Sequence, residues 1–386
     1  MHLVDLGLLP FHVGMADRPT NGAALPDRMP FALSIRNGLL VERPNPEVDA
    51  LLAQAYGRGS VVGTPMSEGG LGRRYADDFF AFILRKTGGV KGARLLELGC
   101  GSGYLLWRLN EQGADAVGLE PGSQAEEAAQ EHGLRILRGT FPHPGLAEQG
   151  RFDLILHYAV LEHALDPLAF LKAQRPLLAE GGRIVFAVPD CGPFIAQGDP
   201  SMFLHEHWSY FSRESLRSLA AAAGFELLAL EPSGFGGALY ALAAPGATVS
   251  ADQPPDLLAF PERLARSVSA ARAYFRDAAV SRKQVGVFCA ARVINLLELA
   301  APPMLPRLFD DDPRLAGRYY PPFDRAVESR AALLERPVDE LIILSRAFGE
   351  RIRAELAAEA SLRSTRFLLP EEWLGYSKAD TLAGAR

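Results

Sequence analysis

A strand that runs directly into three glycines and then into a helix is the feature that most constrains this chain. The segment Arg94–Leu98 predicts the strand, Gly99, Gly101 and Gly103 follow at a spacing of two, and Tyr104–Gln112 has a helical pattern. Glycine lets the backbone turn sharply, so that a ligand can lie against bare main chain above the helix N-terminus. The segment therefore predicts a ligand site on an α/β sheet.

Strands and helices alternate through the middle of the chain. The predicted strands are Arg94–Leu98, Ala116–Leu119, Arg135–Arg138, Phe152–His157, Arg183–Val188, Phe225–Leu230 and Leu239–Ala243. Most gaps between them hold predicted helices, which are Tyr104–Gln112, Ser123–His132, Pro167–Leu178 and Arg213–Ala223. This alternation predicts a doubly wound seven-stranded α/β sheet whose last two strands form an antiparallel hairpin.

Three parts are predicted along the chain. Residues 1–90 alternate short apolar runs with Pro, Gly and Asn, and predict a small irregular module that feeds a helix. Residues 91–246 carry the sheet, and residues 256–386 predict a long helix followed by a second, Rossmann-like α/β domain. The small, polar and proline-bearing segment between these last two parts predicts a linker.

The composition indicates a cellular compartment and limits the classes of partner that we expect. The 386 residues carry a net charge of -6 and no basic run, which argues against nucleic acid, and no apolar stretch is long enough for a membrane span. Three widely separated cysteines allow neither a disulfide framework nor a four-thiolate zinc site. We therefore expect a cytoplasmic protein that acts on a small molecule, and a homodimer is compatible with the sequence.

Two acidic residues flank the glycine turn. Glu97 precedes the first glycine, where a carboxylate suits a cationic amine better than a pyrophosphate. Glu120 ends the next strand, where an acid can accept both hydroxyls of a ribose. The glycine spacing G-x-G-x-G differs from the dinucleotide fingerprint G-x-G-x-x-G, although another kind of nucleotide-binding Rossmann domain remains the alternative.

These residues resemble the S-adenosylmethionine (SAM) site of class I methyltransferases. The resemblance implies an enzyme that uses SAM as its co-substrate and binds it through the glycine turn, the second acid and the segments after the third and fourth strands. Contacts with SAM are then expected at Glu97, Gly99, Cys100, Gly101, Gly103, Glu120, Pro121, Gly139, Thr140, Phe141, His157 and Tyr158. Among these, Cys100 is expected to be a small apolar spacer and not a nucleophile.

The run Val160-Leu161-Glu162-His163 follows the fourth strand and closely matches the family stretch that borders both SAM and acceptor. The resemblance implies that His163 lies near the transferred methyl group. A neutral imidazole there could remove the proton from an acceptor oxygen, nitrogen or activated carbon. The alternative is that His163 only caps the following helix.

A second cluster of ionisable residues, His205-Glu206-His207, lies among aromatic residues after the fifth strand. We expect Glu206 and His207 to form a hydrogen-bonded pair that binds the acceptor or shuttles a proton, and a structural clasp is the alternative. Two histidines one residue apart can bind metal, but no thiolate or further carboxylate cluster completes a site, so no metal is expected. Tyr56 is a further catalytic candidate, because the N-terminal segment could close over the site as a lid.

His-Glu-His followed by Tyr210-Phe211-Ser212 resembles the three-domain sugar C-methyltransferases, which join a zinc-binding N-terminal domain, a SAM domain and a C-terminal Rossmann-like domain. Three departures stand against this resemblance. Residues 1–90 contain no cysteine, Leu204 replaces the family's tyrosine, and Phe288–Arg292 replaces its glycine-rich turn. They imply a relative that keeps the SAM site and methylates carbon, oxygen or nitrogen of another acceptor, in bacterial secondary metabolism.

Two other functions fit the same residues. In one, the amine of SAM attacks its own side chain and releases methylthioadenosine, which the loss of the sugar-family tyrosine and zinc would permit. In the other, the protein is a SAM-binding accessory subunit without turnover, although the intact Glu97–Gly103 turn and the crowded His205–His207 run count against this. The reaction products distinguish these functions from methyl transfer.

Overall fold

The computed structural model describes residues 1–12, 14–22, 25–57, 70–246 and 256–374, which divide into two compact units. Unit 1 comprises Met1–Ser34, Cys191–His205 and Asp256–Arg386, and unit 2 comprises Ile35–Asp190 and Glu206–Pro255. The three-part division predicted from the sequence stays a prediction. Each unit is described by itself.

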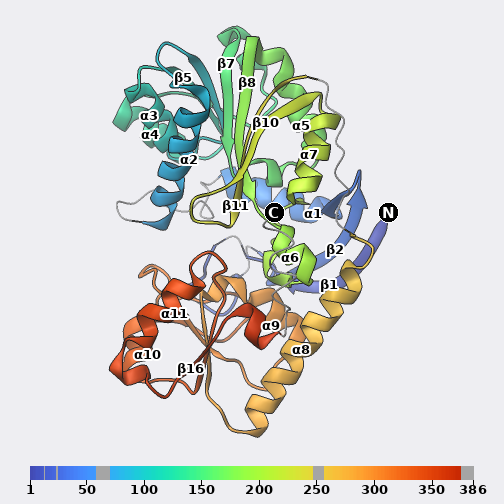
Figure 1. Ribbon diagram of the computed structural model, residues 1–386, viewed down its shortest axis with the longest axis vertical. Helices are drawn as coiled ribbons and strands as arrows, with labels where there is room; N and C mark the ends of the chain where they lie inside the picture. The colour runs from blue at the N-terminus through green and yellow to red at the C-terminus, as the bar shows by residue number, and fades with distance from the viewer. Residues whose placement is uncertain (13, 23–24, 58–69, 247–255, 375–386) are drawn as a thin grey trace. The chain divides into compact units, whose positions relative to one another are not determined.

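Unit 2 contains a seven-stranded mixed sheet with the strand order β10-β11-β8-β7-β4-β5-β6 (Figure 1). Its strands are β4 (Arg94–Leu98), β5 (Asp115–Glu120), β6 (Arg135–Arg138), β7 (Phe152–Tyr158), β8 (Leu178–Pro189), β10 (Phe225–Pro232) and β11 (Ala238–Pro245). The strands from β8 to β6 pair in parallel, whereas β11 runs antiparallel to both β8 and β10. This confirms the predicted doubly wound sheet with its antiparallel closing hairpin.

Helices cover both faces of this sheet (Figure 1). On one face, α2 (Leu71–Thr87) and α3 (Tyr104–Glu111) pack an apolar cluster against the strands, and on the other face α5 (Pro167–Gln174) and α7 (Arg213–Ala222) do the same. The helix α4 (Gln124–His132) connects β5 to β6. Because both faces are covered, the central strands appear in the sequence as nearly continuous apolar runs.

The predicted helix Pro167–Leu178 is shorter in the structure. α5 ends at Gln174, a 3-10 turn covers Arg175–Leu177, and β8 already begins at Leu178. Pro176 explains the early end, because proline has no backbone N–H to continue the hydrogen bonds of the helix.

Residues 1–45 contain strands where the sequence analysis predicted irregular structure. β1 (His2–Pro10) pairs antiparallel with β2 (Arg28–Arg36), and the buried Met29, Phe31 and Leu33 alternate along β2 as in a half-buried strand. Pro30 interrupts this pattern in the sequence, but it occupies an exposed position of the strand. In unit 2, the short β3 (Leu39–Glu42) pairs antiparallel with β9 (Ser209–Tyr210), and α1 (Pro46–Gly57) follows β3.

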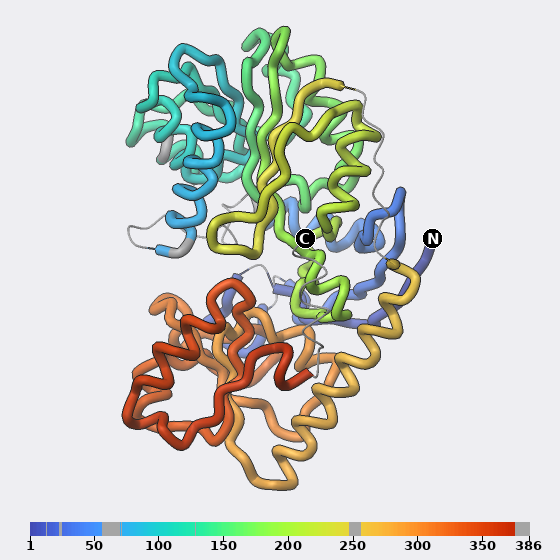
Figure 2. Tube along the Cα trace, viewed as in Figure 1, coloured from blue at the N-terminus to red at the C-terminus, as the bar shows by residue number. Residues whose placement is uncertain are grey.

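Unit 1 contains a five-stranded parallel sheet with the strand order β14-β13-β12-β15-β16. Its strands are β12 (Val285–Phe288), β13 (Arg307–Asp310), β14 (Val327–Ser329), β15 (Glu340–Ile343) and β16 (Arg366–Leu368). The long α8 (Phe260–Val280), which Figure 2 traces into β12, packs on one face with α9 (Ile294–Ala300) and α12 (Pro370–Trp373). α10 (Arg330–Glu335) and α11 (Gly349–Ala357) cover the other face, so the predicted C-terminal α/β fold is confirmed.

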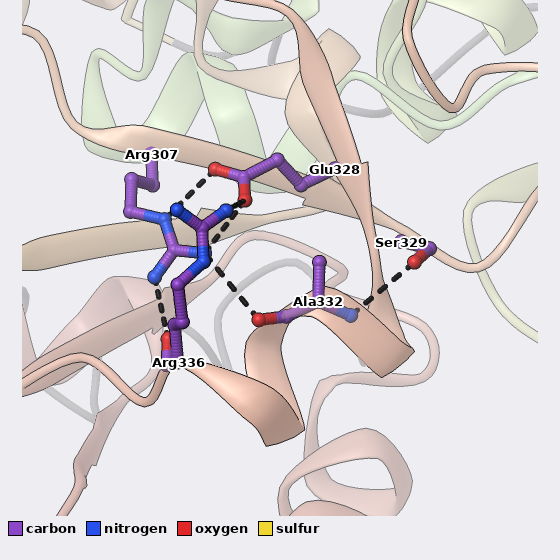
Figure 3. A network of polar contacts seen from close by, with 5 residues as sticks. All are labelled: Arg307, Glu328, Ser329, Ala332 and Arg336. Atoms are coloured by element: carbon purple, nitrogen blue, oxygen red, sulfur yellow. Dashed lines mark hydrogen bonds and ion pairs between the residues drawn. The ribbon is translucent and has the colours of Figure 1, made fainter.

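A polar network fastens one edge of this sheet (Figure 3). Arg307 of β13 donates two hydrogen bonds to the Glu328 carboxylate of β14, at 2.8 and 2.6 Å, and Arg336 donates a third at 3.0 Å. Ser329 caps α10 by accepting the backbone N–H of Ala332 at 3.3 Å. An arginine–carboxylate pair with two hydrogen bonds fixes the relative orientation of its two side chains. The network therefore holds β13 and β14 together at this edge and links them to the end of α10.

Residues 191–205 belong to unit 1 and include α6 (Gly192–Gln197), which contacts α8. The backbone at Gly198, directly after α6, lies very close to α8, because a Cβ at Gly198 would lie 2.3 Å from the backbone of Arg263. Within the described ranges, no helix combines the length and apolarity needed to cross a membrane.

Candidate functional site

The turn between β4 and α3 has a conformation that its glycines permit. Gly99, Gly101 and Gly103 have φ angles of 70°, 53° and 71°, in the left-handed region that favours glycine. A Cβ at Gly99 would lie 2.6 Å from Cγ2 of Val160, so packing fixes this residue. A Cβ at Gly101 would meet none of the described atoms within 4 Å, so bare main chain faces open space there.

Glu120, at the end of β5, is bonded to this turn. Its carboxylate accepts the backbone N–H of Gly101 at 2.9 Å and that of Gly122 at 2.7 Å, and Gln124 Nε2 lies at 3.4 Å. The side chain is largely buried, with 6% of its surface exposed. A carboxylate has about four acceptor positions, so Glu120 retains capacity for a ligand hydroxyl.

Glu97 is a second buried carboxylate, in β4. It is 3% exposed, and its Oε2 has no hydrogen-bond partner among the described residues. Burial, with the negative charge of Glu120 as a smaller cause, raises the pKa of Glu97 well above its usual value, against a hydrogen bond from the Leu106 backbone. A cationic ligand group would supply the missing partner and favour the ionised form.

Cys100 fills space inside the turn. A Cβ at Gly118 would lie 2.6 Å from the Cys100 sulfur, so the thiol occupies the room that the glycine leaves. Burial, with the charges of Glu97 and Glu120, raises the pKa of this thiol well above its usual value. Because the thiolate is the nucleophilic form, this setting agrees with the expected role of an apolar spacer.

The segments after β5 and β6 lie next to the glycine turn. The backbone N–H of Gly139 donates to the carbonyl oxygen of Glu120 at 3.2 Å, and the carbonyl of Pro121 accepts from Arg138 at 2.8 Å. Thr140 is exposed, and Phe141 packs edge-on against Phe170 with 5.1 Å between the ring centroids. The structure thus brings the ends of β4, β5 and β6 together, as parallel pairing requires.

His157 and Tyr158, also expected near SAM, pack among aromatic rings of β7 and its neighbours. His157 is completely buried and stacks on Phe186 with 5.0 Å between the ring centroids, and burial lowers its pKa to about 3. Tyr158 packs against Phe79 with 5.3 Å between the ring centroids, and burial raises the pKa of Tyr158. Contact of either residue with SAM stays a prediction.

His163 lies in the 3-10 turn Leu161–His163 after β7. Its Nδ1 is 2.8 Å from the backbone oxygen of Glu206, and because a carbonyl only accepts, Nδ1 must carry a proton. In the neutral ring, Nε2 therefore keeps its lone pair. Burial lowers the pKa of His163 to about 4, so the ring is neutral near pH 7 and offers Nε2 as an acceptor.

Glu162 and His207 lie beside His163. The rings of His163 and His207 meet edge to face with 4.9 Å between their centroids, and Glu162 Oε1 is 4.0 Å from His163 Nε2. One ligand atom from each of the three side chains lies within 4.8 Å of the others. Glu162 is 1% exposed, and burial, reinforced by the charge of Glu206, raises its pKa to about 8.

Comparison with known proteins agrees with this geometry. A family model described as a methyltransferase domain matches residues 71–230, which include the glycine turn, Glu120 and the Glu162–His163 pair. Residues 71–230 form a class I SAM-dependent methyltransferase domain. SAM is the co-substrate that this domain family uses, and the predicted membership is confirmed at this level.

Curated relatives match within this methyltransferase domain. A ubiquinone biosynthesis O-methyltransferase of Cereibacter sphaeroides is 39% identical over 108 residues, which cover 27% of this chain and 44% of that protein. One of Vibrio parahaemolyticus is 29% identical over 112 residues, covering 28% and 48%. This chain therefore spans less than half the length of the relatives it matches.

A 1,6-didemethyltoxoflavin-N1-methyltransferase of Burkholderia thailandensis is 19% identical with a TM-score of 0.41, covering 56% of this chain and 95% of that one.

The three residues of the His-Glu-His run have different surroundings. His207 joins the cluster at the methyltransferase domain, and Glu206 supplies the backbone oxygen that orients His163. His205 belongs to unit 1, where it packs edge-on against Phe11 and Phe31 at 5.3 and 5.1 Å between ring centroids.

Other site residues were missed or are not visible. The sequence analysis did not assign a role to Glu162, although it belongs to the run matched to the family, because its burial cannot be read from its neighbours. Glu42, which ends the apolar β3, was also missed; it is buried, its carboxylate has no partner among the described residues, and burial raises its pKa to about 10. Tyr56 lies in α1, and its side chain falls outside the described part of the structure.

Proposed function

We propose that this protein transfers the methyl group of SAM to a small-molecule acceptor. The hydrogen bond from the Gly101 N–H to the Glu120 carboxylate carries this proposal, because it joins the ends of β4 and β5 beside bare main chain. SAM would lie over Gly101, with its ribose hydroxyls donating to Glu120 and its amino group beside the unpartnered oxygen of Glu97.

The proposed reaction is a direct substitution. A lone pair on the acceptor attacks the methyl carbon, the bond between this carbon and sulfur breaks, and its electrons return to sulfur, giving S-adenosylhomocysteine. The sulfonium is already a good leaving group, so alignment of the two reactants supplies much of the rate. An acceptor O–H, N–H or activated C–H must also give up its proton.

His163 is the proposed catalytic base for that proton. Its Nε2 keeps a lone pair because Nδ1 donates to the carbonyl of Glu206, which therefore acts as a positioning residue. His207 lies against the His163 ring and would bind the acceptor or relay the proton. Tyr56 stays a candidate through closure of its segment over the site.

The acceptor is proposed to be a metabolite of bacterial secondary metabolism, methylated on oxygen, nitrogen or carbon in the cytoplasm. The curated relatives are ubiquinone biosynthesis O-methyltransferases, and this supports a small organic acceptor. The resemblance of the His205–Ser212 run to sugar C-methyltransferases supports carbon methylation, whereas the lack of cysteine in residues 1–90 separates the chain from that family's zinc domain.

Calorimetric titration with SAM tests the site. We expect wild type to bind one SAM per chain and Glu120→Ala to bind at least about 30-fold more weakly, because hydrogen bonds to a charged group contribute about 2 kcal/mol. Asp115→Ala is the matched control, since Asp115 is an exposed acid at the other end of the same strand. Equal affinities in all three proteins would refute the assignment of Glu120.

Mass spectrometry of the products tests the reaction. Phenols, amines and keto-sugars supplied with SAM are the acceptors to screen, and S-adenosylhomocysteine with a methylated acceptor is the expected outcome. Methylthioadenosine formed without an acceptor would show cyclisation of SAM instead. Tight SAM binding with neither product would point to an accessory protein.

A further inference from the structure

The cluster of Glu162, His163 and His207 has the composition of a metal centre. It offers two imidazole nitrogens and one carboxylate oxygen, all within 4.8 Å of one another. Two histidines and one carboxylate are a common ligand set for catalytic zinc and related divalent ions, which keep a further position open for water or substrate. We propose that these three residues bind one divalent transition-metal ion.

The orientation of His163 supports this site independently of the ligand spacing. A metal-binding histidine almost always donates its second ring N–H to a carbonyl or a carboxylate, which fixes the tautomer and aims the other nitrogen at the metal. His163 already donates Nδ1–H to the backbone oxygen of Glu206 at 2.8 Å. Its Nε2, the nitrogen nearest to Glu162, is therefore the ligand atom.

The Glu162 carboxylate gives a second reason. It is 99% buried, and its Oε2 receives no hydrogen bond from any residue that the structure describes. A buried polar atom without a hydrogen-bond partner destabilises the folded protein, and a buried charged atom does so more strongly. A cation held between Glu162 and the two imidazoles would supply the missing partner.

Small side-chain adjustments would complete the coordination. Ligand atoms about 2.0–2.2 Å from a tetrahedral zinc lie about 3.3 Å from one another, so the cluster must contract from its present spacing. His207 and Glu162 can approach His163 by rotation of their side chains, while the hydrogen bond to Glu206 holds the His163 ring.

The part of this ion in catalysis rests on the proposed function. An acceptor oxygen in the open position would lose its proton to a solvent water molecule more readily, because a divalent cation stabilises the resulting anion. Nε2 of His163 can hold either the ion or a proton, so in the metal-bound protein the ion replaces His163 in activating the acceptor.

Titration of the untagged, full-length chain with Co²⁺ after removal of metals by a chelator tests the site. We expect one Co²⁺ per chain, visible d–d absorption of low-symmetry coordination, and displacement by Zn²⁺. Glu162→Gln and His207→Asn each remove one ligand and should weaken Co²⁺ binding by about 100-fold or more.

His205→Asn is the matched control, because it removes a buried histidine from the same run but leaves the three ligands in place. Unchanged Co²⁺ affinity in this variant supports the site, whereas loss in this variant would show that His205 and His207 form the site instead. No saturable binding by wild type, or equal binding by wild type, Glu162→Gln and His207→Asn, would overturn the proposal.

SAM titration of the same preparations separates the two proposals. Retained SAM binding shows that a variant's methyltransferase domain is folded. Loss of Co²⁺ binding with retained SAM binding in Glu162→Gln supports the metal site alone. Wild type that binds Co²⁺ but not SAM would refute the proposed function and leave the metal site standing.

Discussion

The mixed sheet of unit 2 and the parallel sheet of unit 1 share one local arrangement of strand, turn and helix. In each, a first strand enters a tight turn and a helix follows, while the neighbouring strand ends in an acid: Gly99 and Glu120 in unit 2, Cys289 and Asp310 in unit 1. Gly99 and Cys289 even share the left-handed conformation, with φ angles of 70° and 67°. The first residue of each turn thus has the same backbone conformation, whereas only the unit 2 turn has further positive φ angles, at Gly101 and Gly103.

This difference decides what each turn can bind. Beside Gly99, Glu120 accepts an N–H from across the turn, and Gly101 leaves open main chain. In unit 1, Asp310 accepts the N–H of Asp312 from its own loop at 3.1 Å, and Cys289 packs against an apolar cluster. We therefore expect a ligand at the Gly99 turn, where the main chain is bare, and no nucleotide at Cys289.

The largest expected effect comes from adding one methyl group to the glycine turn between β4 and α3, where SAM is proposed to bind. Gly101→Ala should weaken SAM binding by up to about 100-fold, because its Cβ would occupy the space proposed for the ligand. Gly133→Ala is the control, since Gly133 also has a positive φ, of 63°, and no described atom within 4 Å of a built Cβ. Both variants carry similar backbone strain, so calorimetry that finds equal losses would contradict the role of Gly101.

Acidification should destabilise both units through histidines whose pKa is lowered by burial, two of which lie in each unit. Burial lowers the pKa of His157 in unit 2 to about 3 and that of His12 in unit 1 to about 4. The unfolded chain binds these protons near pH 6.5 and the folded chain only below pH 4, so stability is lost as pH falls from 6.5. The loss should approach about 1.4 kcal/mol per pH unit for each histidine.

Chemical denaturation between pH 7 and pH 5 checks this expectation. His157→Gln removes one titrating group from unit 2 and should give a smaller loss of stability over this range than wild type. An identical pH dependence in the two proteins would contradict the assignment of a neutral, buried His157.

The packing of Cys100 gives a smaller effect. Gly118→Ala places a Cβ 2.6 Å from the Cys100 sulfur and should lower the free energy of unfolding by about 1–2 kcal/mol. In Gly118→Ala/Cys100→Ala, the shortened side chain should restore part of this loss. A double variant that loses the sum of both single effects would show that the two sites do not interact.

The smallest effect is expected at the turn in unit 1. Cys289→Gly relieves left-handed backbone strain of about 1–2 kcal/mol. It also removes a packed side chain and increases the conformational entropy of the unfolded chain. Because these effects oppose one another, the free energy of unfolding should change by less than about 1 kcal/mol. Calorimetry with adenine nucleotides should show no binding in this variant, because Ala290, Ala291 and Arg292 still replace a glycine-rich turn. Binding that appears in Cys289→Gly would show that one side chain alone separates the two turns.

Sequence alone predicted the glycine turn that the proposed SAM site uses, because the parts of this turn are local. The glycines follow β4 directly, and parallel register places Glu120 at the end of the adjacent strand. Sequence also predicted the sheet and its closing hairpin, since strands covered on both faces leave long apolar runs. The ends of these elements were less accurate where Pro176 shortened a helix.

The acceptor half could not be assembled in this way. Glu162 and His163 are adjacent, but His207 reaches them through tertiary packing, and nothing in His-Glu-His tells which of its histidines does so. For the proposed metal site, the sequence analysis sought a third ligand near His205 and His207 and did not consider Glu162 and His163. The paired strands β1 and β2 were also missed, because Pro10 at the end of β1 and Pro30 at an exposed position of β2 resemble loop signals.

A crystal structure of the protein with S-adenosylhomocysteine tests the central claim most directly. We predict that the ligand lies over Gly101, with a ribose hydroxyl within about 3 Å of the Glu120 carboxylate and the amino group beside Glu97. A ligand bound elsewhere, or with its ribose away from Glu120, would contradict the assignment of this turn as the SAM site.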